Sequence, residues 1–136
     1  MVMHIKSLIS EHQKIIEEMV EKLKNRGFYI EANIPSSRSA QPILGHIPDI
    51  MAYRGSSKII VEVATFDPLR NEDILLQRLS IFSKMRIGQN EFYIVVPDEI
   101  LIEFQEKLNR LNITVDKFFT YNEILSSEES ENQESE

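Results

Sequence analysis

Two acidic residues stand in segments that otherwise have the composition of buried β-strands. Asp49 belongs to IPDIMAYR, residues 47–54, and Glu62 belongs to KIIVEVAT, residues 58–65. A glycine and two serines separate the segments, which predicts a hairpin with a two-residue turn. The register of that hairpin places Asp49 opposite Glu62, with Cβ atoms about 4.5–5.5 Å apart. Two carboxylates are therefore expected on one patch of a sheet.

Opposed carboxylates in such a place suggest metal chemistry. Both faces of the two segments are mostly apolar, so the strands are expected to be central in the sheet. Like charges there are destabilising unless they are paired, protonated or bound to a metal. Mg²⁺ accepts one or two carboxylates and keeps waters for a phosphate substrate, on which it acts as a Lewis acid. The structural alternative is that Asp49 caps the turn after Pro48 while Glu62 pairs with a nearby arginine or lysine.

The rest of the sequence predicts the elements that position these strands. Apolar residues at helical spacing predict amphipathic helices, and apolar runs bounded by turn formers predict strands. The predicted helices span residues 5–26, 67–85 and 98–111, and the predicted strands span residues 28–34, 47–54, 58–65, 91–96 and 113–119. Gly27 is expected to end the first helix, and Asp67 and Asp98 to cap the other two. The order α-β-β-β-α-β-α-β predicts an α/β fold, a central mixed sheet flanked by helices, in one domain of residues 1–125.

Composition limits the classes of function. The 136 residues include no cysteine, so neither a disulfide nor a thiolate metal site is possible. There is no apolar run of about 18 residues and no signal peptide, so a cytoplasmic protein without a membrane partner is expected. The chain also has no glycine-rich phosphate loop, no G-x-S-x-G elbow and no H-E-x-x-H pair.

The formal net charge of −7 is concentrated at the C-terminal end. Residues 126–136 contain five glutamates and nothing that could form a core, and they are expected to be a disordered acidic tail. The remaining residues carry a net charge of −2, so composition neither supports nor excludes nucleic acid as a partner. Any basic surface must be local.

These motifs resemble the PD-(D/E)XK nuclease superfamily, which has the restriction-endonuclease-like fold. The resemblance rests on a first helix that ends in Arg-Gly-Phe, on Pro48-Asp49, and on Glu62 in the next apolar strand, within the order α-β-β-β-α-β. It covers roughly residues 5–120, and archaeal Holliday junction resolvases of this kind are similarly compact. It implies a metal-dependent endonuclease that uses Mg²⁺ or Mn²⁺ on DNA, commonly as a homodimer. Asp49 and Glu62 would be catalytic metal ligands, and the backbone carbonyl at Val63 would complete the metal shell.

The sequence departs from the family at one position. Two residues after the acidic residue of the second strand, the family has lysine, or glutamate in some members, whereas this chain has Ala64. The lysine is thought to orient the attacking water and to steady charge on the phosphate, roles worth about 10²–10⁴ in rate. The following helix could supply a replacement through Gln77, Arg78 or Lys84, of which Gln77 is the preferred catalytic candidate.

Two histidines could also contribute to the site. His12 lies on the apolar stripe of the first helix, where a histidine is more often a hydrogen-bonded packing residue than a ligand. His46 precedes Asp49 by three residues and is either a base near the site or an exposed loop residue.

Two functions follow from this pattern. The first is a metal-dependent nuclease that hydrolyses phosphodiesters in DNA, with Arg38, Arg78 and Lys84 as contacts to nucleic acid. The second is a catalytically inactive nuclease-fold module that binds nucleic acid or a protein partner. It is favoured by the alanine at the lysine position.

Overall fold

The computed structural model describes residues 2–64 and 72–126 of the chain. Its sheet has five strands in the order β1-β2-β3-β4-β5. The strands are β1 (Tyr29–Ala32), β2 (Ile50–Arg54), β3 (Ser57–Val63), β4 (Asn90–Val96) and β5 (Lys117–Thr120). The pairs β1–β2 and β2–β3 are antiparallel, whereas β3–β4 and β4–β5 are parallel. The predicted α/β fold with one mixed sheet is confirmed.

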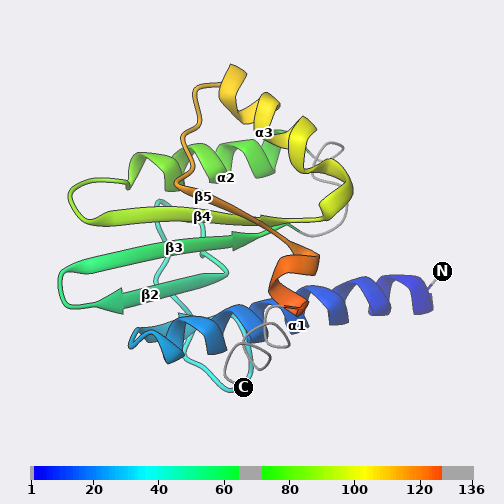
Figure 1. Cartoon of the computed structure of the whole chain (residues 1–136), viewed down its shortest axis with the longest axis horizontal. Coiled ribbons are helices and arrows are strands. Elements are labelled where there is room, and N and C mark those ends of the chain that lie inside the picture. Colours follow the sequence, from blue (N-terminus) through cyan, green and yellow to red (C-terminus); the bar gives the residue numbers. More distant parts are fainter. Residues whose placement is uncertain (1, 65–71, 127–136) are drawn as a thin grey trace, which may run out of the picture.

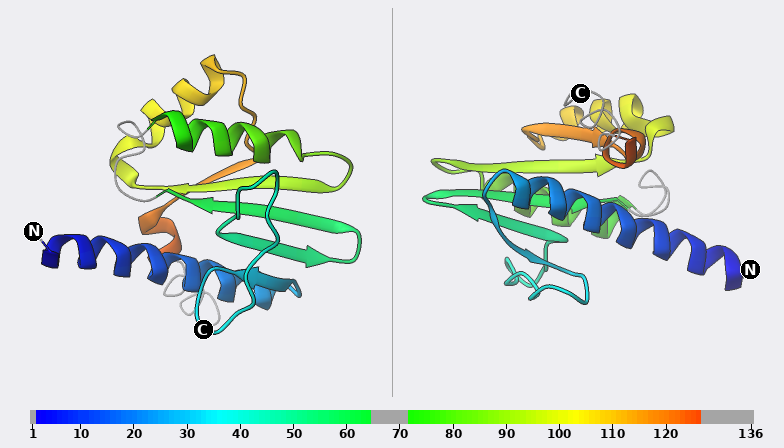
Figure 2. Two further views of the ribbon diagram at one scale, coloured as in Figure 1. Left: turned by 180° about the vertical axis from the view of Figure 1, so that it is seen from behind. Right: turned by 60° about the horizontal axis from the view of Figure 1, so that its bottom comes forward.

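Helices lie on both sides of the sheet (Figures 1 and 2). They are α1 (Val2–Asn25), α2 (Glu72–Lys84), the short 3₁₀ helix η1 (Asp98–Ile100) and α3 (Leu101–Arg110), and residues 121–126 are also helical. None of the helices formed by residues 2–64 and 72–126 has the length and apolar character of a membrane-spanning helix.

The core has two parts because side chains of a strand alternate between its faces. On one face α1 buries an apolar stripe against the odd-numbered residues of β3; the stripe is Ile15, Ile16, Met19, Val20 and Leu23. On the other face α2 and α3 bury Leu79, Phe82, Phe104 and Leu108 against residues such as Ile60 and Phe92. The strands β3 and β4 are therefore covered on both sides, as their continuous apolar sequences require.

The hairpin β2–β3 has the predicted register. Arg54 pairs with Ser57 and Met51 pairs with Ile60. Gly55 has a φ of 60°, in the left-handed region that a two-residue turn of this kind uses. The register that brings Asp49 close to Glu62 is therefore present in the structure.

The helix predicted at residues 98–111 differs from the prediction at both of its ends. Asp98 was predicted to cap the third helix, but it lies inside η1, and neither η1 nor α3 has a side-chain cap. Its Oδ1 instead accepts the backbone N–H of Asn122 at 3.1 Å, so it supports the helical segment 121–126. Leu111, the last residue of the predicted helix 98–111, follows α3 and is 49 % exposed. The cap predicted at Asp67 lies outside the described residues, as do residues 127–136 of the predicted acidic tail.

Candidate functional site

Asp49 and Glu62 meet where β2 begins and β3 ends. The last backbone pair of the hairpin is Ile50 with Val61, and beyond it the two carboxylates hydrogen-bond to the backbone of the opposite segment. Asp49 Oδ2 accepts the backbone N–H of Val63 at 2.8 Å, and Glu62 Oε1 accepts the backbone N–H of Asp49 at 3.4 Å. Both acidic residues are buried. Each carboxylate therefore holds the partner strand as well as adding charge to the site.

Glu62 is paired with an arginine from α2. The Nη2 and Nε atoms of Arg78 donate to Glu62 Oε2 at 2.7 and 3.1 Å. Nη2 also donates to the carbonyl of Ile47 at 3.0 Å, so the guanidinium links the helix to the loop before β2. The Glu62 side chain is only 6 % exposed and that of Arg78 is 22 % exposed. The pair is largely removed from water.

Arg78 alone does not neutralise the two carboxyl groups of Asp49 and Glu62. Burial raises the pKa of Glu62 to about 8, with a second contribution from the negative charge of Asp49, while Arg78 acts in the opposite direction. Desolvation and a neighbouring like charge both disfavour ionisation of a carboxyl group. The Glu62 carboxyl is therefore a position where a proton or another cation is favoured near neutral pH.

The partner of Asp49 comes from α1. His12 Nε2 lies 3.0 Å from the carbonyl oxygen of Val63 and 3.6 Å from Asp49 Oδ2. Because a carbonyl only accepts, Nε2 carries the proton in this contact. Burial lowers the pKa of His12, but the hydrogen bond and charge of Asp49 outweigh that effect and raise it above the ordinary 6.5. His12, on the apolar face of α1, therefore brings a proton donor to the site beside Asp49.

The segment after β5 also reaches the site. The Tyr121 hydroxyl donates to the carbonyl of Ala64, and burial raises the pKa of this hydroxyl above its ordinary value. Tyr121 is absent from the predicted site, although the sequence from Thr120 to Glu123 has the T-x-x-E pattern of a capping box. That box is present: Glu123 Oε1 accepts the N–H of Thr120 at 2.9 Å, and the N–H of Glu123 donates to Thr120 Oγ1 at 3.2 Å.

No protein-family model, no curated protein and no solved structure matches this chain. The sequence resemblance and the geometry of these side chains are therefore the guide to the function of the chain.

The other predicted residues of α2 lie away from the carboxylates. Gln77 is exposed and makes no hydrogen bond with the described part of the chain. It is adjacent to Arg78, and successive residues of a helix point about 100° apart, so a helix that turns Arg78 toward Glu62 turns Gln77 away. Lys84 is exposed in the last turn of α2. Arg78 alone of the three reaches the carboxylates.

The predicted loop residues are also outside the cluster. Arg38 is exposed, and its backbone carbonyl accepts the N–H of Ala32 at 2.8 Å. His46 forms an isolated bridge with Ile43 through its backbone, and its ring makes no contact with the site in the described part of the chain. The structure therefore brings together Asp49, Glu62, Val63 and Arg78, and it adds His12 and Tyr121 to them.

The oxygen atoms that were expected to bind a metal accept hydrogen bonds from groups of the protein. Asp49 Oδ2 accepts the Val63 N–H, Glu62 Oε2 accepts two donors of Arg78, and the Val63 carbonyl accepts from His12. Within residues 2–64 and 72–126, no group of three or more histidine, aspartate and glutamate side chains could hold a metal ion. As arranged here, these oxygens accept hydrogen bonds from Arg78, from His12 and from the backbone.

Proposed function

We propose that this chain is a nucleic-acid-binding module with the architecture of a PD-(D/E)XK nuclease and without its hydrolytic activity. The order of its elements, with Asp49 immediately before β2 and Glu62 on the adjacent β3, supports the architectural half of this proposal. The observation that carries the other half is the double hydrogen bond from Arg78 to Glu62. It places a fixed cation where a nuclease of this kind would need a free carboxylate.

The position of the missing lysine supports the same conclusion. Ala64 is buried, its N–H donates to the carbonyl of Val95 at 2.9 Å, and its carbonyl accepts from Tyr121. Among the side chains that the structure describes, no ammonium group contacts the carboxylates to orient a water or to steady a phosphate. In this proposal the four charged groups serve to join α1, the hairpin and α2, and recognition of nucleic acid takes place on another surface.

Cleavage and binding assays on the same preparation test the proposal. With labelled duplex, junction and single-stranded DNA, we expect binding and no strand cleavage in Mg²⁺ or Mn²⁺. We also expect Ala64→Lys to add no hydrolysis, because the guanidinium of Arg78 still donates hydrogen bonds to the Glu62 carboxylate. Metal-dependent cleavage that is lost in both Asp49→Ala and Glu62→Ala would overturn the proposal.

A metal-dependent endonuclease acting on DNA is the second candidate. It is favoured by the burial of Glu62 and the charge of Asp49, which together raise the pKa of Glu62 to about 8 in spite of Arg78. Mg²⁺ or Mn²⁺ would be the cation, and hard divalent ions accept as few as one or two carboxylates. Calorimetry with Mn²⁺ separates the candidates: the endonuclease requires saturable binding near one ion per chain, which the binding module does not.

A homodimer belongs to both proposals, because relatives of this architecture commonly address two strands with two sites. The outer strands β1 and β5 each pair on one side only, which leaves an edge that a second copy could use. Light scattering of the purified chain tests this point, and a mass of one chain at all concentrations contradicts it.

A further inference from the structure

A row of aromatic and basic side chains crosses one face of the sheet at the end remote from the carboxylates. Tyr29 pairs with Tyr53, and Tyr53 pairs with Lys58, so the three side chains point to the same face. The rings of Tyr29 and Tyr53 are 6.2 Å apart between centroids, and Lys58 Nζ lies 5.6 Å from the centroid of Tyr53. Tyr29 is 58 % exposed at the edge of the sheet. The row therefore ends in an aromatic ring that is open to solvent.

A basic pocket adjoins this row along the outer edge of β1. It has a volume of about 670 Å³ and lies between the end of α1, β1 and the loop that follows β1. Lys24, Tyr29, Ser36, Ser37 and Arg38 contribute side chains to its wall. The two charged residues of the wall are both cationic, and neither makes an ion pair with the described part of the chain. The pocket thus combines two uncompensated positive charges, two hydroxyl groups and an exposed ring.

Neighbouring groups keep the pocket positive. Arg26 is exposed beside it, and Arg54 donates to the Arg26 carbonyl at 2.6 Å with its guanidinium 4.3 Å from the centroid of the Phe28 ring. The acidic residue of this strand, Glu31, is buried and accepts the hydroxyl of Tyr53 at 3.2 Å. This cluster of cations is notable because the chain as a whole has a net charge of −7. It is the local basic surface that an acidic chain needs to bind a polyanion.

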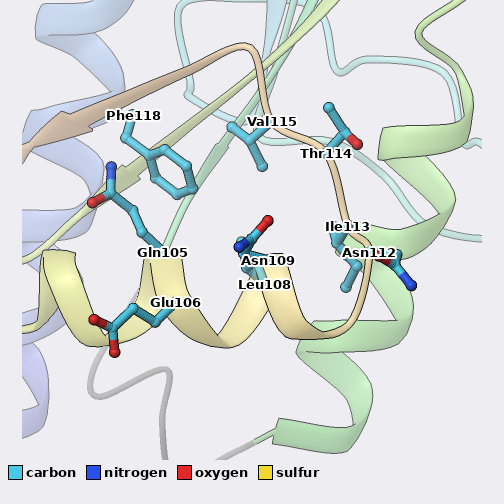
Figure 3. A pocket seen from close by; sticks show the side chains of 9 residues that line it. All are labelled: Gln105, Glu106, Leu108, Asn109, Asn112, Ile113, Thr114, Val115 and Phe118. Carbon is cyan, nitrogen blue, oxygen red and sulfur yellow. The ribbon is translucent and has the colours of Figure 1, made fainter.

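The pocket between α3 and β5 lacks these properties. It has a volume of about 480 Å³, and Figure 3 shows amide side chains such as Gln105 and Asn109, one carboxylate, Glu106, and the ring of Phe118 around it. No cationic side chain lines it. The comparison separates a neutral to acidic surface at one edge of the sheet from a basic surface at the other.

We propose that the β1 surface, defined as Lys24, Tyr29, Ser36, Ser37 and Arg38, binds single-stranded nucleic acid. Lys24, Arg38 and the Ser36 hydroxyl bind phosphates, and an unpaired base stacks on Tyr29. The Ser37 hydroxyl donates to the Arg38 carbonyl at 3.1 Å and so helps to hold the loop that carries Arg38. Positive grooves with exposed aromatic rings are the usual basis of single-strand binding, because every base has a face that can stack. In a duplex the bases are already stacked on one another, so an exposed ring favours the single strand. This inference rests on the proposed function and names the surface and the strand form that it uses.

Fluorescence anisotropy with a labelled oligothymidylate of about 16 nucleotides tests this surface, a length at the upper end of common single-strand sites. EDTA in the buffer makes the measurement independent of any metal-dependent reaction. The full chain is compared with Lys24→Glu/Arg38→Glu and with Tyr29→Ala. The matched control is Lys14→Glu/Arg110→Glu, which changes the net charge equally at two exposed positions outside the pocket.

We expect the Lys24→Glu/Arg38→Glu variant to bind at least about tenfold more weakly, and the slope of log K against log salt to fall by about 0.7 for each lost phosphate contact. Tyr29→Ala is expected to weaken binding about 5- to 150-fold with an unchanged salt slope. The control variant keeps its salt slope. A folding defect would not lower the salt slope in Lys24→Glu/Arg38→Glu while Tyr29→Ala loses affinity with an unchanged slope.

Three results would overturn the inference: no binding by the full chain at low salt, equal losses in the pocket and control variants, or tighter binding of a duplex of the same length. Failure of the proposed function is a separate result. Metal-dependent cleavage that disappears in Glu62→Ala would remove the non-hydrolytic proposal and leave the β1 surface as the place where the strand binds.

Discussion

The cost of burying a charge differs between the two members of the Arg78–Glu62 pair. Glu62 is surrounded by the sheet and α2, so its carboxylate stays buried if its partner is removed. Arg78 has a long side chain and is 22 % exposed, so its guanidinium can turn into water if Glu62 is neutralised. An uncompensated buried charge is far more costly than a lost hydrogen bond. The two single substitutions should therefore differ in cost.

Arg78→Met is expected to lower the free energy of unfolding by about 2–4 kcal/mol, a buried-pair cost reduced for partial exposure. Glu62→Gln, which leaves no buried charge, is expected to cost less than half as much. Urea unfolding followed by circular dichroism at about pH 9.5, where a carboxyl with a pKa of about 8 is ionised, measures both, and Lys84→Met, exposed on the same helix, is the control. Equal costs for the two variants would mean that Glu62 is not charged in the folded protein.

The two carboxylates could be located from sequence, whereas their partners Arg78 and His12 could be named only as candidates beside residues such as Gln77, Lys84 and His46. The register of a two-residue hairpin is fixed by the period of two along a strand, so a glycine and the alternation of apolar residues suffice to place Asp49 opposite Glu62. Arg78 and His12 arrive on helices from opposite sides of the sheet. Which turn of a helix faces a given strand depends on packing of the whole face, and that information is not local in the chain.

At the scale of elements, capping determines how the last segment reaches the site. The reciprocal hydrogen bonds of Thr120 and Glu123 start the helical segment 121–126 immediately after β5. This places Tyr121 against Ala64 and Ile124 in the core under α1. A short segment with one capping box depends strongly on it, because isolated short helices are unstable in water.

Glu123→Ala should therefore loosen this segment selectively. Loss of a capping interaction costs about 0.5–2 kcal/mol, and the loss should appear locally before it appears in global unfolding. Hydrogen exchange measured by NMR is expected to show faster exchange of the Thr120 and Glu123 amides, with the amides of β3 unchanged. Glu103→Ala, an exposed glutamate of α3, is the control. Unchanged protection at Thr120 would show that packing of Ile124 alone holds the segment.

Asp116 anchors the start of β5 in the same local manner. Its two carboxylate oxygens accept from Arg86 at 2.8 and 2.7 Å, and Oδ2 also accepts the N–H of Phe92 at 2.8 Å. The predicted strand 113–119 began too early for this reason. Ile113 donates its N–H to the Leu108 carbonyl as part of the turn after α3, and regular pairing with β4 begins only at Lys117. Alternating apolar residues predict a strand even where the backbone forms hydrogen bonds with side chains instead of with a neighbouring strand.

Acid is expected to weaken this anchor. The hydrogen bond from Arg86 holds the pKa of Asp116 below its ordinary 3.8, against the opposing effect of burial. The unfolded chain therefore binds the proton more readily, so the stability contributed by Asp116 is present above pH 3.8 and is lost as the pH falls through and below that value.

Asp116→Asn is the variant that tests this linkage. It should lower the free energy of unfolding by about 1–2 kcal/mol at neutral pH and reduce the fall in stability between about pH 5 and pH 3. Urea unfolding across that range measures both effects, with Glu106→Gln on exposed α3 surface as the control. An acid slope identical to that of the unmodified chain would contradict the assignment.

The whole molecule divides its charges between regions. Asp49, Glu62, Arg78 and His12 lie together at one end of the hairpin, and the β1 surface is positive at the other. The sequence contains five further glutamates within residues 127–136, which account for most of the net charge of −7. At low salt such a charge acts over about 10 Å or more and repels a polyanion from the entire molecule. Binding to the β1 surface should therefore depend on a segment that need not touch it.

A chain that stops after Ser126, with a net charge of −2, is expected to bind single-stranded DNA several-fold more tightly at about 0.05 M salt, where the Debye length exceeds 10 Å. The gain should vanish near about 1 M salt, where that length is about 3 Å. The decisive comparison is a full-length chain whose five terminal glutamates are glutamines, since it removes charge without removing residues. Equal gains in both variants identify long-range repulsion as the cause, whereas a gain confined to the shortened chain would mean that the terminal residues occupy the binding surface.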